Sequence, residues 1–270
     1  MNIYIGIGII LVIWNSIIIV KRKIKLSKEK VKTIKNFNLG SSHSLCAFAS
    51  NLSNNTNLAE NSQTFYYDYK VLNTYYDKIE TGGICFLGIS YFSFASKEYW
   101  LETDLFKYYK LLKIADFSGK AKIECLIYKY FPLIWSIYKK IKKERKIDEI
   151  KKYQGHVKKL RENRNLEWNL EIMNNIIKKC KEKSVKVILF TTPFEKEYNN
   201  YFDENLLANN FYKIIDKLKK EHDIIYLDFS KDYLNYNSND FRDLDHLSKL
   251  GSQKFLEQMK KELKKKDVYI

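Results

Sequence analysis

The chain has 270 residues, of which 45% are hydrophobic and 30% are charged. That length and apolar content support one large α/β domain or two small ones, and they exclude a chain that is disordered overall. Two prolines and nine glycines argue against collagen-like and linker-rich architectures, and no period of about 20–50 residues indicates a repeat protein.

The formal net charge of +16 suggests a nucleic acid or an anionic surface as partner. The excess comes mainly from lysines spread along the chain, with clusters at 139–161 and 260–266, and no nucleic-acid-binding motif accompanies it. We interpret the charge as a compositional bias and expect no nucleic-acid partner. A nucleic-acid binder stays open as a hypothesis that rests on the charge alone.

The segment from Ile3 to Val20 carries no charged residue. In a helix it extends over roughly 27 Å, near the lower limit for crossing a bilayer. No basic residue precedes it and no small-residue cleavage site follows it, which favours an uncleaved anchor over a signal peptide. The sequence therefore predicts a single-pass membrane protein, with an anchor at 1–24 that contacts the lipid bilayer through residues 3–20. A buried strand–helix pair is the alternative.

The side of the membrane is left open by the sequence. Eight Lys and Arg residues between Lys21 and Lys35 place the following domain in the cytoplasm by the positive-inside rule. The four cysteines form no CxxC pair and no zinc-type spacing, so we expect free thiols, which agree weakly with a reducing compartment.

Alternating strand and helix patterns follow this basic stretch. Strands are predicted at Thr33–Leu39, Gly83–Ile89, Val185–Phe190 and Ile224–Leu227. Helices are predicted at Ser44–Ala49, Ser62–Asn73, Glu98–Ala115, Leu166–Cys180, Asn205–Lys220 and Ser248–Lys265. Alternation with short links predicts parallel pairing through right-handed crossovers, and hence an α/β fold in the form of a three-layer α/β/α sandwich with a parallel sheet.

This α/β domain is expected to span residues 25–270. Within it, residues 121–164 are apolar and aromatic at first and then strongly basic. We interpret them as a basic helical insertion with a lysine face in solvent, and the alternative is an amphipathic stretch on a membrane surface.

Two short segments hold the residue types of acyl-transfer chemistry. Gly-Ser-Ser-His at 40–43 follows the first strand of the domain, and Asp-Leu-Asp-His at 243–246 precedes the last helix. Because carboxyl ends of parallel strands share one sheet edge, the fold can bring the two segments together. Ser42 would then be the nucleophile, His246 its base, and Asp243 the carboxylate that orients the imidazole.

Other interpretations of these residues remain open. Gly-Ser-Ser before a helix is a common N-cap and also suits a bound phosphate. Asp245 is a substitute for Asp243 as the orienting group, although adjacent side chains usually diverge. His43 and Cys46 could bind a metal together with His246, but no fourth ligand is evident.

Taken together, these segments resemble the first and last sequence blocks of the SGNH (GDSL-type) hydrolase superfamily. The family's first block is a strand followed by Gly-Asp-Ser-Leu, which places Ser42 at the nucleophile. Its last block is Asp-x-x-His, often followed by Leu and a helix containing Gly, matched here by Asp243, His246 and Gly251.

The resemblance covers roughly residues 33–265, since Thr191–Pro193 and Tyr226–Ser230 are also similar to the family. The closest likeness is to the membrane-anchored branch of teichoic-acid D-alanyl transfer proteins and glycan O-acetyltransferases or esterases. It implies a flavodoxin-like, SGNH-hydrolase-like fold at the outer face of a membrane, without metal or nucleotide cofactor. It also implies an oxyanion hole made of the Ser42 and Ser62 backbone N–H groups and the Ser90 side chain.

The two middle blocks depart from the family pattern. Ser62 stands where the family has a glycine, and Ser90 where it has an asparagine whose side chain donates to the oxyanion. A hydroxyl still donates one hydrogen bond but reaches less far, and losing such a donor lowers the rate about 100- to 1,000-fold.

We therefore expect a serine esterase or O-acyltransferase that acts on ester-linked acyl groups, in particular acetyl groups, of a cell-envelope or capsular glycan. The second hypothesis keeps the fold but not the chemistry: a catalytically inactive glycan-binding or assembly partner of a membrane-bound acyltransferase. Reactivity of Ser42 separates the two.

Overall fold

The computed structural model describes residues 2–28, 33–50, 55–96, 102–141 and 148–269, and within the first helix it describes the side chains from Ile9 to Arg22. The chain divides into two compact units. One comprises residues 1–32 and 101–146, and the other comprises 33–100 and 147–270. The second unit contains the sheet and is described first.

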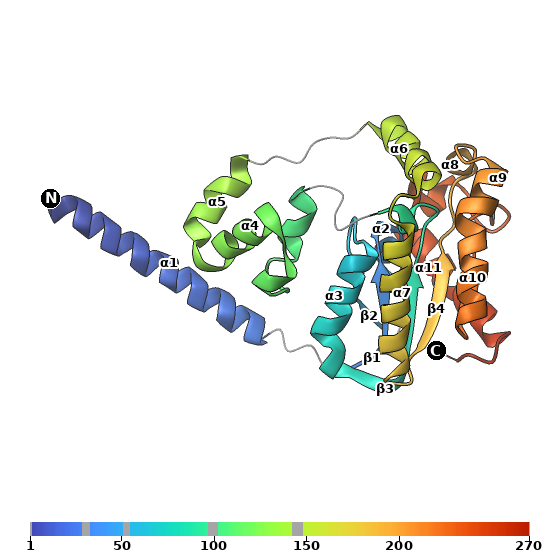
Figure 1. Ribbon diagram of the computed structural model, residues 1–270, viewed down its shortest axis with the longest axis horizontal. Helices are drawn as coiled ribbons and strands as arrows, with labels where there is room; N and C mark the ends of the chain where they lie inside the picture. Colours follow the sequence, from blue (N-terminus) through green and yellow to red (C-terminus); the bar gives the residue numbers. More distant parts are fainter. Residues whose placement is uncertain (1, 29–32, 51–54, 97–101, 142–147, 270) are drawn as a thin grey trace. The chain divides into compact units, whose positions relative to one another are not determined.

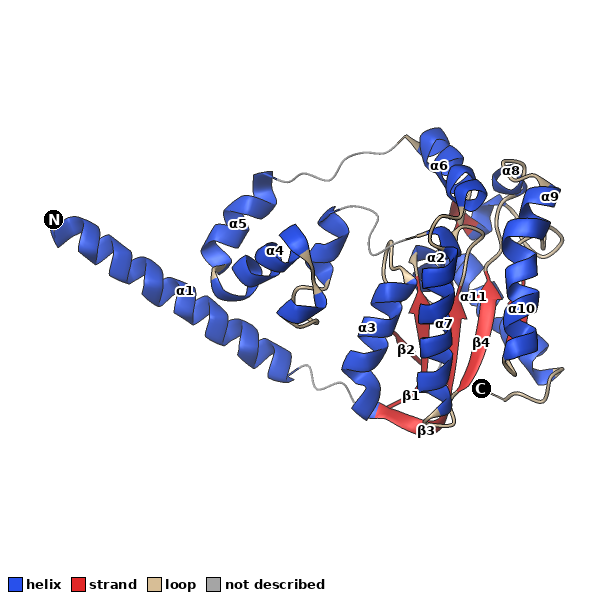
Figure 2. Ribbon diagram, in the orientation of Figure 1, coloured by secondary structure: helices blue, strands red, loops and turns tan. Residues whose placement is uncertain are grey.

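The second unit is an α/β structure around a five-stranded parallel sheet (Figure 2). The strands are β1 (Ile34–Gly40), β2 (Asn55–Asn57), β3 (Ile79–Gly88), β4 (Lys186–Thr191) and β5 (Ile225–Asp228). They lie in the order β2-β1-β3-β4-β5. From β1 the chain crosses to β2 on one side of it, and from β3 it continues through β4 to β5 on the other side. A separate two-stranded hairpin joins β6 (Phe241–Asp243) to β7 (His246–Leu247).

Helices cover both faces of this sheet (Figure 1). The helices of the unit are α2 (Ser42–Ala47), α3 (Phe65–Tyr75), α6 (Glu149–Glu162), α7 (Leu166–Lys181), α8 (Lys196–Asn199), α9 (Glu204–Leu207), α10 (Lys213–Glu221) and α11 (Lys249–Lys264). On one face, Phe86 and Phe190 pack against Phe48 and, from α11, Phe255. On the other face, α3 and α7 lie side by side. Successive strand residues alternate between these two apolar layers, which explains strands that are buried almost throughout.

The sequence predicted four of the five strands of the sheet and most of these helices, but not β2 or the β6–β7 hairpin. Each of the four predicted strands is present with its ends shifted by one to four residues. The helix predicted at Ser62–Asn73 begins later, at Phe65, because Ser62 has a left-handed backbone (φ +54°) that ends the preceding turn. The helix predicted at Asn205–Lys220 is present as α9, a π-helical turn at Ala208–Tyr212, and α10.

The helix predicted at Glu98–Ala115 is not one helix. Its first residues lie outside the described part of the chain, and the rest forms short 3₁₀ turns at Glu102–Lys107 and Ile114–Asp116. Leu105, Tyr108 and Leu112 are buried at helical spacing all the same. Tight turns can bury side chains at three- and four-residue spacing as an α-helix does, so the spacing alone could not distinguish the two.

The first unit consists of α1 (Asn2–Lys28), α4 (Gly119–Tyr130) and α5 (Pro132–Ile141), together with the 3₁₀ turns. Helix α1 contacts both α4 and α5. The Asn15 side chain donates to the carbonyl oxygen of Tyr130 at 2.7 Å, and Arg22 donates to the carbonyl oxygen of Tyr128 at 2.6 Å. Asn15 and Arg22 of α1 are thus used in contacts within this unit.

The predicted membrane anchor is wrong. Over the described residues, no helix combines the length and the apolar character that crossing a bilayer requires. Lys21 and Arg22 follow the uncharged run at residues 3–20 directly, and Asn15 and Arg22 are used in hydrogen bonds to carbonyl oxygens of α4. The single-pass location is corrected accordingly.

The division into units also differs from the expected insertion at 121–164. Helices α4 and α5 belong with α1, whereas α6 belongs with the sheet. Helix α6 begins at a capped end, where the Asp148 side chain accepts a hydrogen bond from the Lys151 N–H at 3.2 Å. It ends at Asn163, whose left-handed backbone (φ 39°) terminates the helix.

Two glycines allow β1 and β3 to pack closely at their carboxyl ends. Gly40 and Gly88 are register partners, and a Cβ on Gly40 would lie 2.6 Å from the Gly88 carbonyl oxygen. Gly40 also has φ +118°, a backbone that favours glycine. The chain can therefore turn sharply from β1 into α2 directly beside β3.

Two helical glycines provide a matched test of the packing. A Cβ on Gly251, in the first turn of α11, would lie 2.0 Å from the Asp240 carbonyl oxygen, whereas a Cβ on Gly155 in α6 would meet nothing within 4 Å. We expect Gly251→Ala to lower the free energy of unfolding by about 1–3 kcal/mol, because backbone must move. Gly155→Ala should raise it by about 0.5–1 kcal/mol. Urea denaturation measures both, and equal effects would contradict the packing of α11 on the Asp240 turn.

Candidate active site

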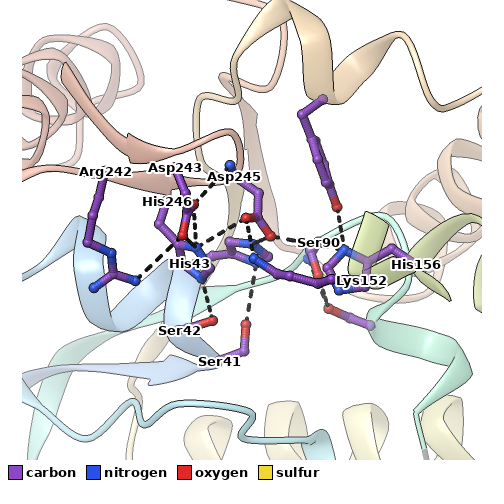
Figure 3. Close-up of polar contacts among 12 residues, drawn as sticks. Ser41, Ser42, His43, Ser90, Lys152, His156, Arg242, Asp243, Asp245 and His246 are labelled. Atoms are coloured by element: carbon purple, nitrogen blue, oxygen red, sulfur yellow. Dashed lines mark hydrogen bonds and ion pairs between the residues drawn. The ribbon is translucent and has the colours of Figure 1, made fainter. Parts of the chain in front are cut away.

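The structure brings Ser42, Asp243 and His246 together (Figure 3). The Ser42 Oγ lies 2.7 Å from His246 Nε2, and His246 Nδ1 lies 2.7 and 3.0 Å from the two carboxylate oxygens of Asp243. Ser42 is the first residue of α2, directly after β1, and the other two residues pair with each other across the β6–β7 hairpin. The predicted serine, base and orienting carboxylate thus form one hydrogen-bonded chain.

The topology explains why residues 204 positions apart meet. In an open parallel sheet, the crevice outside the carboxyl ends of the strands opens where the crossovers change side, which here is between β1 and β3. Ser42 follows β1 at that point. The β6–β7 hairpin reaches the same edge because α2 contacts both β7 and α11.

Asp243 and Asp245 determine which nitrogen of the His246 ring carries a proton and how firmly the ring holds a second one. Because Nδ1 faces Asp243, it carries the proton, and Nε2 is left to accept the Ser42 hydroxyl proton. Burial lowers the pKa of His246, but hydrogen bonds and negative charge from Asp243 and Asp245 outweigh it and leave this pKa above its ordinary value. This arrangement suits a base that becomes a stabilised imidazolium during serine attack.

A second carboxylate and a second histidine lie directly behind this chain. Asp245 is fully buried, with Oδ1 3.1 Å from His246 Nδ1 and Oδ2 3.1 Å from His43 Nε2. The two imidazole rings stack with their centroids 4.8 Å apart. Asp245 therefore does not diverge from His246 as adjacent side chains usually do, because the tight hairpin turn directs both inward. His43 Nδ1 in turn lies 3.5 Å from the Ser41 hydroxyl.

Helix α6 contributes two residues that the sequence did not identify. The Lys152 ammonium donates to Asp245 Oδ1 at 2.7 Å, and His156 Nδ1 lies 3.0 Å from the Tyr198 hydroxyl. The His156 side chain is 11% exposed and its ring stacks on Phe92, so this histidine of the basic stretch is not solvated. Burial lowers the pKa of His156 to about 2, which keeps the ring neutral.

The spacing of three residues in the sequence could have predicted that α6 packs against the sheet domain. Tyr153, His156 and Leu160 lie three and four residues apart, which is the spacing of one helical face, and they are the side of α6 that packs inward. Lys152 offered no such signal, because it is one of many lysines in a basic stretch.

Ser62 lies in a loop tied to the nucleophile segment. The Glu60 N–H donates to the Gly40 carbonyl oxygen at 3.2 Å, two residues before Ser62. The left-handed backbone of Ser62, with φ +54°, is of the kind that glycine adopts most readily.

Ser90 follows β3 and is buried, and its hydrogen bonds go to Ser93. The Ser93 Oγ accepts from the Ser90 N–H at 2.9 Å and lies 3.1 Å from the Ser90 Oγ. When the Ser93 hydroxyl donates to the Ser90 Oγ, the Ser90 hydroxyl proton is directed elsewhere and can serve a substrate oxygen.

One group of metal-ligand type occurs among the described residues, and it consists of His43, Asp245 and His246. Cys46, which the sequence grouped with the two histidines, is not a member; Asp245 takes its place. The Lys152 ammonium already contacts Asp245 at the distance of an ion pair, so a lysine supplies positive charge to this carboxylate.

Comparison with known proteins adds no family assignment. No family model matches the chain, and no curated protein matches it either. The function must therefore be argued from the geometry of the site.

A buried carboxyl group connects the nucleophile turn to the loop that carries Ser62. The Asp68 Oδ1 on α3 accepts hydrogen bonds of 2.7 Å from the Gly40 N–H and from the Gln63 side chain. Burial raises the pKa of Asp68 to about 7, although both hydrogen bonds oppose the rise. Asp68 is thus a structural link between the two segments.

Asp68 makes stability fall as the pH rises. Its folded-state pKa of about 7 lies above the unfolded value of about 3.9, so between these values only the folded chain holds the proton. The contribution of Asp68 to the free energy of unfolding is fully present below about pH 4. It declines between pH 4 and pH 7, by at most about 1.4 kcal/mol per pH unit. We expect Asp68→Asn, which cannot ionise, to remove that decline.

Urea denaturation at pH 5 and pH 8 measures the change in the free energy of unfolding between the two pH values, with Asp77→Asn at an exposed position as control. Parallel changes in all three proteins would contradict the assignment.

Proposed function

We propose that this protein is a serine-dependent ester hydrolase or O-acyltransferase. The observation that carries the proposal is the hydrogen-bonded chain from Ser42 through His246 to Asp243, with both distances at 2.7 Å. A serine hydroxyl is a weak nucleophile until a neighbouring base removes its proton, and this geometry supplies the base in the required tautomer.

The reaction follows from the positions of these groups. Ser42 Oγ forms a bond to the ester carbonyl carbon while its proton passes to His246 Nε2. The ester C–O bond then breaks, and His246 returns the proton to the departing alcohol. Water, or the hydroxyl of an acceptor, next attacks the carbonyl carbon of the acyl-serine and gives its proton to His246 Nε2. The bond between the acyl carbon and Ser42 Oγ then breaks, and His246 returns that proton to Ser42 Oγ. Water as acceptor gives an esterase, and a sugar hydroxyl gives a transferase.

The oxyanion that forms on the ester carbonyl needs donors at the same edge. We propose the backbone N–H groups of Ser42 and Ser62 and the Ser90 hydroxyl for this task. The N–H of Ser42 lies in the first turn of α2, where backbone N–H groups lack partners within the helix. The loop of Ser62 is bonded to Gly40, and β3, which precedes Ser90, pairs with β1.

The finer fold and substrate assignments are also proposals. The strand order is that of flavodoxin-like doubly wound sheets, which supports a three-layer, SGNH-hydrolase-like fold. With the motif resemblance, this supports an ester-linked acyl group, in particular acetyl, on a cell-envelope or capsular glycan as the substrate. The rival proposal, a catalytically inactive glycan-binding or assembly partner of a membrane-bound acyltransferase, is favoured by the replacement at Ser90.

Labelling of the full chain with a fluorophosphonate probe tests the chemistry. We expect stoichiometric labelling, located on Ser42 by peptide mass spectrometry, because the probe reports an activated serine. Ser42→Ala should abolish labelling, and His246→Ala should slow it at least about 100-fold, since general-base catalysis contributes about 10²–10⁴.

Ser41→Ala is the matched control. Ser41 neighbours the nucleophile, but its side chain makes no capping hydrogen bond to α2, so labelling should persist. A folded wild-type protein that does not label would overturn the enzyme and favour the inactive partner. A labelled protein would then be assayed for release of acetate from acetylated oligosaccharides.

A further inference from the structure

The buried carboxylate Asp245 is the centre of a second polar network beside the proposed triad (Figure 3). Its side chain has no exposed surface, and nitrogen atoms approach it from several elements. Oδ1 contacts Lys152 Nζ at 2.7 Å and His246 Nδ1 at 3.1 Å, whereas Oδ2 contacts His43 Nε2 at 3.1 Å. Oδ2 also lies 4.0 Å from His156 Nδ1.

Asp245 stays ionised because of these contacts. Burial opposes the charge, but hydrogen bonds from His246 and His43 outweigh it and hold the pKa of Asp245 well below its ordinary value. A buried carboxylate without a cation is strongly destabilising. Burial also keeps the pKa values of His43 and His156 low, so those rings are neutral. Among the described residues in contact with Asp245, Lys152 is therefore the one that brings a permanent positive charge.

We propose that Asp245 and Lys152 act as a positioning pair for His246, sharing the orienting role of Asp243. This inference rests on the proposed function. Asp245 places a second negative oxygen at His246 Nδ1 and fixes the His43 ring that stacks on His246. Lys152 offsets the charge of Asp245, so that the two carboxylates hold a proton on His246 less firmly than they would without the ammonium. The pair thereby sets both the orientation and the basicity of the residue that activates Ser42.

The charges around His246 balance when its ring is neutral. The titratable and charged groups that face this cluster are His43 and Cys46 from α2; Arg242, Asp243 and Asp245 from β6 and its turn; Glu149, Lys152, Tyr153, His156 and Lys159 from α6; and Tyr198 from α8. Burial raises the pKa of Cys46 and of both tyrosines, so these groups are neutral. Glu149 and Lys159 carry opposite charges, and the charges that remain next to His246 and Asp245 are two carboxylates, Asp243 and Asp245, against Arg242 and Lys152.

Removing the Lys152 charge leaves this cluster with excess negative charge. The imidazolium of His246 is then stabilised before any substrate arrives, so its pKa rises and the neutral base is present only at higher pH. Loss of packing alone would instead lower reactivity by the same factor at every pH. The pH profile therefore separates an electrostatic role of Lys152 from a merely structural one.

The test is the rate of fluorophosphonate labelling of Ser42 as a function of pH in the full chain. The labelling rate should rise with pH as His246 loses its proton, and we call this rise the acidic limb of the pH profile. For Lys152→Met we expect the midpoint of the acidic limb to lie about one pH unit higher than in the wild type. Lys152→Arg should return the midpoint to its wild-type pH, because guanidinium keeps the charge. Lys151→Met, at the exposed neighbouring position, is the matched control. An unmoved limb in Lys152→Met, with or without a uniform loss of rate, would overturn the proposal.

A double variant tests whether Lys152 acts through Asp245. In an Asp245→Asn background the buried charge is gone, so Lys152→Met should no longer shift the limb. This background also protects the experiment against misfolding, since no uncompensated carboxylate remains. A shift that persists in the Asp245→Asn background would overturn the pairing.

An NMR titration of the His246 ring separates this inference from the proposed function. The ring pKa can be followed whether or not Ser42 reacts. If the His246 pKa rises in Lys152→Met but Ser42 is never labelled, the result supports the positioning pair and contradicts the proposed enzymatic function. A pKa that stays constant in a protein that labels would overturn the pair alone.

Discussion

The hydrogen bond between Ser42 and His246 joins the beginning of the sheet domain to the segment before its last helix. It can form only if β1 ends at the edge where the β6–β7 hairpin lies. Parallel pairing of β1 with β3, and the close approach that Gly40 and Gly88 allow, put α2 at that edge. The Asp68 carboxyl then fixes the Gly40 N–H, so the position of the serine is set by backbone contacts and by the sheet.

The parts of the fold that the sequence could predict are those controlled by local patterns. Short apolar runs such as Gly83–Ile89 have few alternatives to a buried strand, and their alternation with helical stripes fixes parallel pairing. The proximity of Ser42, Asp243 and His246 could be predicted for the same reason, since Ser42 follows the first strand and Asp243 and His246 share one tight turn. The parallel sheet then places the end of the first strand and this turn at the same edge, so the three side chains meet.

What the sequence could not predict depends on long-range contacts. The spacing of Leu105, Tyr108 and Leu112 fits a helix, yet the backbone forms 3₁₀ turns because burial, not backbone type, is what the spacing encodes. The apolar run at residues 3–20 predicts a membrane segment, but it lies in a helix that contacts α4 and α5, and no described helix has the length and apolar character that crossing a bilayer requires.

The roles of α6 and Asp245 show the same limit within the site itself. A lysine in a basic stretch reads as a solvated side chain, and only a buried carboxylate in another part of the chain gives Lys152 a different role. Two carboxylates at one imidazole would hold its proton too firmly for a base, and a neighbouring ammonium counters that excess. Seen this way, the basic helix and the acidic hairpin depend on each other. The hairpin buries a second carboxylate, α6 brings a cation to it, and Lys152 is oriented toward the site because that carboxylate is there.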